Sequence, residues 1–216
     1  MRTTNYIPAL RFKWLTPLYD FLLRVTMPEQ RIKEKVIALA GIPLNAKVLD
    51  FGCGTGTLTI MIKESHPDAI VSGIDIDISV LNQAIRKAES KGLDILLLNY
   101  DGRKLPFQND SFQIVISCLV FHHLDCSIKR SVLEELFRVM DKNGQLIIAD
   151  SGRSKSWLHR ILFNLKRGLD GYKSTYANAK GLLPEFISDA GFEMVNINNR
   201  IKTIFGEVQL VSAGKI

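Results

Sequence analysis

The chain has 216 residues, 46% of them hydrophobic and 23% charged, with a net charge of +6, which is typical of one globular domain with a substantial core. Its three cysteines, Cys53, Cys118 and Cys126, are odd in number and imply no disulfide framework, and the sequence has no metal-ligand spacing. The longest apolar runs fall well short of the ~20 residues that cross a bilayer as a helix, and prolines and charges interrupt the N-terminal hydrophobes, so we expect a cytoplasmic protein without an export signal.

The N-terminal region predicts two helical segments. Residues 5–24 place apolar side chains at roughly helical spacing, with Pro17 suited to the first turn of a helix. We interpret residues 1–28 as a lid or a docking segment. Residues 29–40 then predict a charged helix that ends at Gly41.

The most informative stretch is residues 47–57, KVLDFGCGTGT. An apolar run breaks into three glycines at alternate positions, Gly52, Gly54 and Gly56, and an apolar helix pattern follows over residues 57–65. A side chain in such a turn clashes with a positive φ or blocks a ligand from the backbone, so we expect a ligand at the end of this strand. The spacing differs from the Gly-x-Gly-x-x-Gly of dinucleotide folds, and Asp50 precedes it, which points away from NAD.

Downstream, apolar strands alternate with amphipathic helices, which predicts a parallel sheet covered on both faces. Strands are expected at residues 69–74, 94–98, 112–118 and 145–149, with helices at 80–90, 128–140 and 183–190 and a turn at 141–144. Two alternating segments, 192–198 and 207–213, predict a final antiparallel pair.

Polar side chains follow the ends of three of these strands. Asp75 ends the second strand, where nucleotide-binding folds hold a ribose because a carboxylate accepts two hydrogen bonds from a vicinal diol. Asp101 and Gly102 follow the third strand, and a plain Asp-Gly turn is the alternative there. His122 and His123 follow the fourth strand; either could act as a base near neutral pH or simply anchor the next helix.

The heptapeptide Asp50–Gly56 resembles the first motif of class I S-adenosylmethionine-dependent methyltransferases, in the branch that contains the ubiquinone/menaquinone-biosynthesis methyltransferases. Residues 101–107 resemble the family's acid-then-Leu-Pro-Phe stretch, and residues 136–144 its Arg-Val-Leu-Lys-Pro-Gly-Gly segment, with Asn143 replacing one glycine. The resemblance covers about residue 30 to the end, and we assign residues 29–216 to the methyltransferase domain. It implies a Rossmann-like, seven-stranded, mostly parallel α/β sheet with one antiparallel strand, helices on both faces and an N-terminal helical lid.

The resemblance also implies S-adenosyl-L-methionine as the cofactor, with S-adenosyl-L-homocysteine as its product. The glycine turn then lies against the methionine part, with Asp50 near its amino group; Asp75 holds the ribose, Ile76 packs on adenine, Asp101 with Gly102 meets the adenine edge, and Ser117 and Leu119 lie under the sulfonium. The implied cofactor residues are Asp50, Phe51, Gly52, Cys53, Gly54, Thr55, Gly56, Asp75, Ile76, Asp101, Gly102, Ser117, Leu119 and Tyr19, and the candidate catalytic residues are His122 and His123. Tyr19 resembles a tyrosine that closes over the cofactor in relatives, and a tyrosine packed in the core is an equal alternative.

The positive charge lies outside the glycine-turn half of the chain. Residues 1–46 carry seven Lys/Arg and three Asp/Glu, residues 47–150 eleven and fourteen, and residues 151–216 ten and five. Residues 156–169 predict a basic amphipathic helix, for which ordinary core packing with a solvated basic face is the more frequent explanation. We treat residues 151–182 as a substrate-cap insertion.

These basic flanks with apolar stripes favour a small, apolar or amphiphilic acceptor, either a quinone precursor or a lipid-like molecule, and peripheral contact with an anionic membrane. The fourth strand lacks the Asn/Asp-Pro-Pro-Tyr/Phe tetrapeptide of enzymes that methylate nucleic-acid bases, which disfavours nucleic acid. A polar metabolite is an alternative acceptor. The competing classes are a catalytically silent S-adenosylmethionine-binding regulatory or scaffold protein and an RNA methyltransferase that uses the basic patches.

Overall fold

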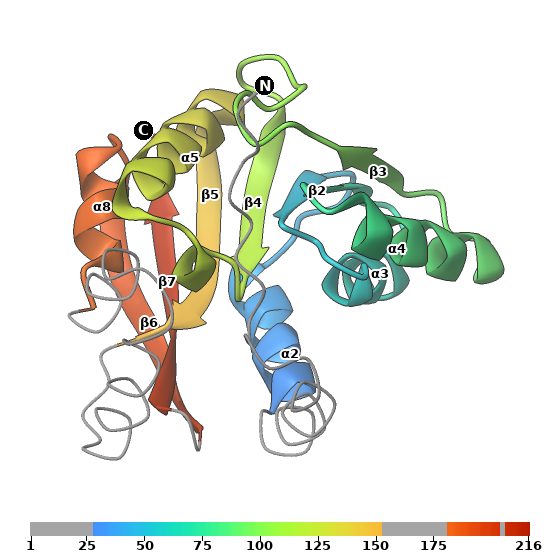
Figure 1. Ribbon diagram of the computed structural model, residues 1–216, viewed down its shortest axis with the longest axis horizontal. Coiled ribbons are helices and arrows are strands. Elements are labelled where there is room, and N and C mark those ends of the chain that lie inside the picture. The colour runs from blue at the N-terminus through green and yellow to red at the C-terminus, as the bar shows by residue number, and fades with distance from the viewer. Residues whose placement is uncertain (1–27, 153–180, 204–205) are drawn as a thin grey trace.

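The structure, a computed structural model, describes residues 28–152, 181–203 and 206–216 (Figure 1). The expected N-terminal lid lies outside the described residues except for its last residue, and Tyr19 lies outside with it. Of the expected cap at residues 151–182, only the two ends are described. Among the described residues, no helix combines the length and the apolar character needed to cross a bilayer.

The described residues form one seven-stranded sheet in the order β3-β2-β1-β4-β5-β7-β6. The neighbours from β3 to β5 pair in parallel, whereas β7 lies antiparallel between β5 and β6. The strands are β1 (Lys47–Phe51), β2 (Ile70–Asp75), β3 (Leu96–Asn99), β4 (Phe112–Cys118), β5 (Met140–Ser151), β6 (Glu193–Thr203) and β7 (Gly206–Gly214). The predicted mostly parallel sheet with one antiparallel strand is confirmed.

Helices cover both faces of the sheet because successive residues of the central strands point to opposite sides. Val48 packs in the core that contains residues of α2 and α3, whereas the adjacent Leu49 packs in the core that contains residues of α5 and α8. Figure 1 shows α3 and α4 beside β2 and β3, with α5 and α8 near the opposite end of the sheet. The helices are α2 (Glu29–Ala40), α3 (Thr57–Ser65), α4 (Ile78–Ser90), α5 (Cys126–Val139) and α8 (Leu183–Asp189), with a 3-10 turn η1 (Phe121–His123).

Local signals account for the ends of several helices. Gly41 follows α2 in the left-handed conformation, with φ 50°, as expected for a glycine just past a helix. Asp77 caps α4 by accepting the backbone N–H of Ser79 at 2.8 Å, so Ser79 lies within the helix, and the helix begins two residues before its predicted start. The predicted bounds of α2 and α3 are confirmed.

The fifth strand is longer than predicted. β5 begins at Met140, so the expected turn at residues 141–144 is part of the strand, because Met140 already pairs with Phe112 of β4. The register then shifts before Gln145 pairs with Ile114. Asn143 has a φ of 64° within this irregularity, a conformation that asparagine tolerates better than most residues.

Parallel pairing brings the carboxyl ends of β1, β2, β4 and β5 to one edge of the sheet. The strand order reverses between β1 and β4, since the chain builds outward from β1 to β3 and then returns to add β4 on the other side. In open α/β sheets, ligands bind in the crevice at such a reversal. The glycine turn after β1 lies at this position.

Candidate active site

The loop after β1 contains all three glycines in the left-handed region. Gly52, Gly54 and Gly56 have φ values of 71°, 54° and 74°. The backbone N–H groups of Gly52 and Cys53 donate to the carbonyl of Ile74, at 2.8 and 3.0 Å, and tie the loop to β2. A Cβ at position 52 would lie 2.5 Å from a side-chain carbon of Val120, so glycine is required there by close approach as well as by φ.

A cavity of about 240 Å³ opens beside this loop. We call it the glycine-loop cavity; its lining residues are Glu29, Lys33, Asp50, Gly52, Cys53, Gly54, Thr55, Thr57, Leu58, Cys118 and Leu119. A Cβ at Gly54 would have no protein atom within 4 Å, so the backbone there borders open space in which a ligand can approach it. Six of these residues are predicted cofactor residues: Asp50, Gly52, Cys53, Gly54, Thr55 and Leu119.

Asp50 is the buried acid of the cavity, with 1% of its surface exposed. Burial raises the pKa of its carboxyl to about 6, although the hydrogen bond from the Thr59 hydroxyl, at 2.6 Å, and the charge of Lys33 act in the opposite direction. The carboxylate is therefore mostly ionised at neutral pH, but burial of the ionised form costs free energy. A cationic amino group in the cavity would relieve that cost.

Lys33 and Glu29 of α2 reach the same cavity, and the sequence analysis did not name them. Lys33 is 8% exposed, and its Nζ bonds to Glu29 Oε1 at 2.5 Å. A signal for Lys33 was present, because it shares the buried side of α2 with Val36 and Ala40, at positions i, i+3 and i+7. A lysine on an otherwise apolar stripe is a candidate for a residue that needs a charged partner.

Asp75 lies at the end of β2, as predicted, and its carboxylate links two loops. Its Oδ2 accepts the backbone N–H of Gly54 at 2.7 Å, and its Oδ1 accepts that of Asp77 at 2.9 Å. A carboxylate has about four acceptor positions, so these two bonds leave capacity for hydroxyl donors. The same side chain therefore positions the glycine loop and can bind a ligand.

The residues expected at the adenine lie together beyond Asp75. Ile76 is 48% exposed, and a Cβ at Gly102 would lie 2.9 Å from its Cδ1, which places the two residues in contact. Asp101 is exposed, and its Oδ1 accepts the backbone N–H of Arg103 at 3.0 Å. None of the three lines the glycine-loop cavity, so they form a second part of the candidate site.

Three of the named residues lie behind the cavity wall. Phe51 is 2% exposed and packs against the rings of Tyr100 and Phe121. Ser117 is fully buried, and its hydroxyl donates to the carbonyl of Phe51 at 3.1 Å. Gly56 packs against α4. Cys118, the next residue after Ser117, lines the cavity instead.

His122 contacts a buried acid at the end of β5. Its Nδ1 lies 3.0 Å from Oδ1 of Asp150, and its backbone N–H donates to Oδ2 at 3.3 Å. Burial alone would raise the pKa of the Asp150 carboxyl, but His122 and the backbone N–H of Ser151 outweigh it and hold the pKa below its usual range. An ionised carboxylate only accepts, so Nδ1 carries the proton and Nε2 is the basic nitrogen.

The sequence analysis named His122 and His123 but not Asp150. The ring centroids of the two histidines lie 3.9 Å apart, and the turn that carries them follows Leu119, whose φ of 60° redirects the chain. An acid at the end of a buried strand, the signal used for Asp75, would also have found Asp150.

Comparisons with known proteins agree with this geometry. The family model described as "Methyltransferase domain" matches residues 48–144. A Thermus thermophilus protein named demethylmenaquinone methyltransferase is 33% identical over 141 residues, which are 64% of this chain and 63% of that protein. A Desulfotalea psychrophila protein named ubiquinone/menaquinone biosynthesis C-methyltransferase UbiE is 33% identical over 135 residues, 62% of this chain and 53% of that protein. The chain thus matches less than two thirds of the length of these two curated relatives.

Solved structures share the fold. A S-adenosylmethionine-dependent methyltransferase from Aquifex aeolicus superposes with a TM-score of 0.63 at 21% identity, covering 91% of this chain and 98% of that one. Magnesium protoporphyrin IX methyltransferase from Synechocystis, solved with bound S-adenosylhomocysteine, has a TM-score of 0.65 at 21% identity, covering 87% and 83%. Residues 48–144 thus match a methyltransferase domain, and the described residues share the fold of solved S-adenosylmethionine-dependent methyltransferases.

Proposed function

We propose that the chain transfers a methyl group from S-adenosylmethionine to a small, apolar or amphiphilic acceptor, with a quinone precursor as the first candidate. The observation that carries the methyl-transfer part is the pair of opposite charges in the glycine-loop cavity, Asp50 and Lys33. The methionine part of the cofactor has an ammonium and a carboxylate: Asp50 complements the ammonium, and Lys33, which has three N–H donors and bonds Glu29, can also donate to the carboxylate. The residues present therefore fit the cofactor.

The proposed cofactor contacts follow the two parts of the site. In the cavity, Asp50 accepts from the cofactor's ammonium group and Lys33 faces its carboxylate. The glycine loop lies along the carbon chain of the methionine part. Beyond it, Asp75 accepts from the ribose hydroxyls, and Asp101 with Ile76 and Gly102 meets the adenine. Cys53, Thr55 and Leu119 complete the cavity wall, whereas Phe51, Gly56 and Ser117 support it from behind. Tyr19 stays a proposed contact outside the described residues.

The cofactor supplies a methyl group on a positively charged sulfonium, already activated for in-line attack. The chain then has to position the acceptor, exclude water and remove a proton where the acceptor is a hydroxyl or a carbon acid. His122 is the proposed base, because Asp150 fixes its Nδ1 as a donor and so directs Nε2 to take the proton. Asp150 does not touch the acceptor, so it is a positioning residue, and its negative charge stabilises the imidazolium that forms. His123 is the second candidate.

Two observations support an apolar acceptor. The relatives from Thermus thermophilus and Desulfotalea psychrophila are named for demethylmenaquinone and for ubiquinone/menaquinone biosynthesis. The sequences of residues 1–28 and 151–182 combine basic and apolar side chains, which suits cover over a lipid-soluble molecule and peripheral contact with an anionic membrane. We propose that these two segments cover the bound acceptor.

The direct test uses methyl-labelled S-adenosylmethionine with the purified chain. Demethylmenaquinone, a lipid extract, total RNA and a soluble-metabolite extract are offered separately, and Asp50→Asn serves as the control with impaired cofactor binding. We expect label in the quinone or the lipid fraction and none with the control. Label confined to the soluble metabolites would contradict the apolar acceptor, and label in RNA would favour the RNA methyltransferase. Cofactor binding without label in any fraction would favour the silent binding protein.

The role of His122 has its own test. In His122→Gln we expect kcat to fall about 100-fold, the lower range for loss of a general base, with the affinity for S-adenosylhomocysteine unchanged. Asp150→Asn should also reduce kcat, by no more than His122→Gln does, because Asp150 acts through His122. His66→Gln, a histidine that follows α3, is the matched control. If His122→Gln keeps wild-type kcat and the same pH–rate profile, the base lies elsewhere.

A further inference from the structure

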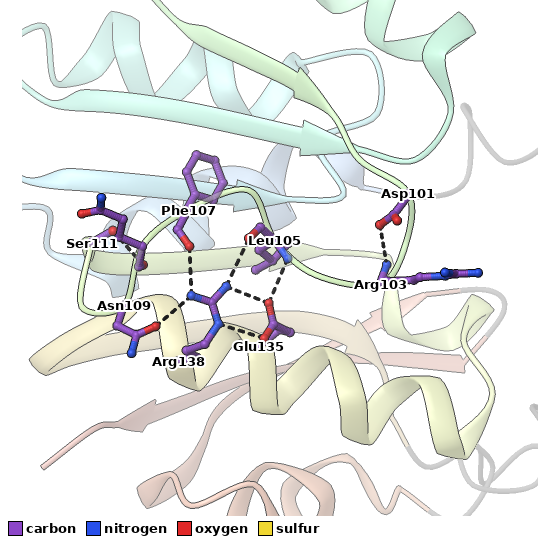
Figure 2. Close-up of polar contacts among 9 residues, drawn as sticks. Asp101, Arg103, Leu105, Phe107, Asn109, Ser111, Glu135 and Arg138 are labelled. Atoms are coloured by element: carbon purple, nitrogen blue, oxygen red, sulfur yellow. Dashed lines mark hydrogen bonds and ion pairs between the residues drawn. The ribbon is translucent and has the colours of Figure 1, made fainter.

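Arg138, near the end of α5, is bonded through all five N–H donors of its guanidinium (Figure 2). Its Nε and Nη2 each donate to one oxygen of Glu135 at 2.8 Å, which makes a bidentate pair. The other three bonds reach the loop between β3 and β4: the carbonyls of Leu105 and Phe107, at 3.1 and 2.9 Å, and Oδ1 of Asn109, at 3.0 Å. We call this pair the Arg138–Glu135 clamp.

Glu135 also holds the loop directly, through the same oxygen that accepts from Nη2 of Arg138. Its Oε2 accepts the backbone N–H of Leu105 at 2.8 Å, so both backbone groups of Leu105 bond to the clamp. Each side chain of the pair is 21% exposed, and the hydrogen bond from Arg138 lowers the pKa of the Glu135 carboxyl. The pair therefore stays ionised across the neutral range, and its planar geometry fixes the position of Leu105.

The other end of the loop is anchored to β2. The side-chain amide of Asn99 donates to the carbonyls of Asp75 and Ile76, at 2.9 Å each. Only the short segment from 100 to 104 lies between this anchor and Leu105, and it contains Asp101 and Gly102. In Figure 2 Asp101 lies on the same loop as the clamped residues, where it bonds to Arg103. The position of the Asp101 carboxylate therefore depends on both anchors.

We infer that Arg138 and Glu135 are positioning residues for adenine recognition, which act through the loop and do not contact the cofactor. This rests on the proposed function, and in particular on Asp101 accepting from the adenine amino group. A loop held in advance loses little conformational freedom when the ligand binds, whereas a released loop must be ordered at the expense of affinity. Release of the loop should therefore reduce, in particular, the affinity that the hydrogen bond between Asp101 and the adenine amino group contributes.

The experiment measures two dissociation constants by calorimetry on the full chain. One ligand is S-adenosylhomocysteine, and the other is its purine-riboside analogue, in which hydrogen replaces the adenine amino group. We expect the wild type to prefer S-adenosylhomocysteine by about tenfold, the worth of one hydrogen bond to a charged group. In Arg138→Lys, which cannot reproduce the planar fork, this preference should fall toward one. If the role of Arg138 were purely structural, the substitution would weaken the binding of both ligands equally and leave the ratio of the two dissociation constants unchanged.

The matched control is Arg130→Lys on the same helix, because Arg130 is 62% exposed and pairs with Asp189 of α8 at 3.9 Å, away from the loop. It should keep the wild-type ratio. If Arg138→Lys does not fold, Glu135→Gln carries the test with the same expectation. An unchanged ratio in a folded clamp variant overturns the inference and leaves the proposed function standing. A wild type that binds neither ligand, or binds both equally, overturns the proposed role of Asp101 and the inference with it.

Discussion

The two parts of the candidate site are held by different kinds of structure. The glycine loop at the proposed methionine end joins β1 to α3 directly and is tied to β2 through Ile74 and Asp75. The loop at the proposed adenine end is largely exposed, and Arg138 of α5, which follows its partners in the loop by 29 to 33 positions, holds it. The methionine end is thus held by the adjacent strands β1 and β2, and the adenine end by a helix that follows it in the chain.

The two ends should therefore differ in their sensitivity to substitution. At the methionine end, a substitution meets a buried carboxylate or a close backbone approach, so single changes should have large effects. At the adenine end, several exposed or half-buried hydrogen bonds share the task, so the loss of one peripheral bond should have a small effect.

The largest effect is expected for Asp50→Asn. The amide keeps the size of the side chain and can still accept from Thr59, but it removes the negative charge proposed to bind the cofactor ammonium. We expect the dissociation constant of S-adenosylhomocysteine to rise at least ~100-fold at pH 7 by calorimetry, in line with the loss of a buried charge-assisted bond. The free energy of unfolding should be unchanged or higher, because the variant no longer buries an ionised carboxyl. Wild-type affinity in this variant would exclude Asp50 as the ammonium partner.

Gly56→Ala tests the close packing of the glycine loop. A Cβ there would lie 2.7 Å from Cβ of Ala84 on α4, and φ is 74°, so strain and overpacking add. We expect a loss of about 2 to 3 kcal/mol in unfolding free energy, measured by urea denaturation. Gly41→Ala is the control: φ is 50°, but no atom lies within 4 Å of its added Cβ, so about 1 kcal/mol is expected. Equal losses in the two variants would mean that contact with α4 is unimportant.

The raised pKa of Asp50 also predicts opposite pH dependences for cofactor affinity and for the free energy of unfolding. Its pKa is about 6 in the folded chain and 3.8 as the ordinary value, so the folded chain binds the proton more tightly. The cofactor affinity should fall about tenfold from pH 7 to pH 5 as the carboxylate is neutralised. The cofactor-free chain should gain stability from this group as the pH falls from about 6 toward 4, by up to about 3 kcal/mol. Both trends should be missing from Asp50→Asn, and a persisting trend would assign the titration to another group.

The smallest effect is expected for Asn109→Ala at the adenine end. Asn109 is exposed and accepts one bond from Arg138, which keeps its bonds to Leu105 and Phe107. We expect a loss of about 1 kcal/mol or less in unfolding free energy and a change in cofactor affinity of less than about threefold. A larger effect than that of Arg138→Lys would contradict a clamp in which several bonds share the task.

Much of this site was readable from the sequence because its signals are local. Three glycines at alternate positions require a backbone that only glycine adopts easily, and an acid at a strand end marks the crevice of a parallel sheet. Local signals mark Lys33 and Asp150 as unusual, because one is a lysine on the apolar side of a helix and the other an acid at a strand end. Their roles are not local, because each depends on a partner distant in sequence. Lys33 lies in a helix before the motif, and Asp150 meets His122 across 28 positions.

Residues close together in the chain encode the strand–loop–helix unit at Asp50–Gly56, the alternation of strands and helices and the resemblance to methyltransferases, so the sequence suffices to predict all three. Tertiary structure alone decided that Lys33 reaches the same cavity as Asp50, that His122 is oriented by Asp150, and that Arg138 holds the loop of Asp101. These contacts arise when parallel strands bring their carboxyl ends to one edge of the sheet and helices pack across it. Such long-range packing has no local pattern in the sequence.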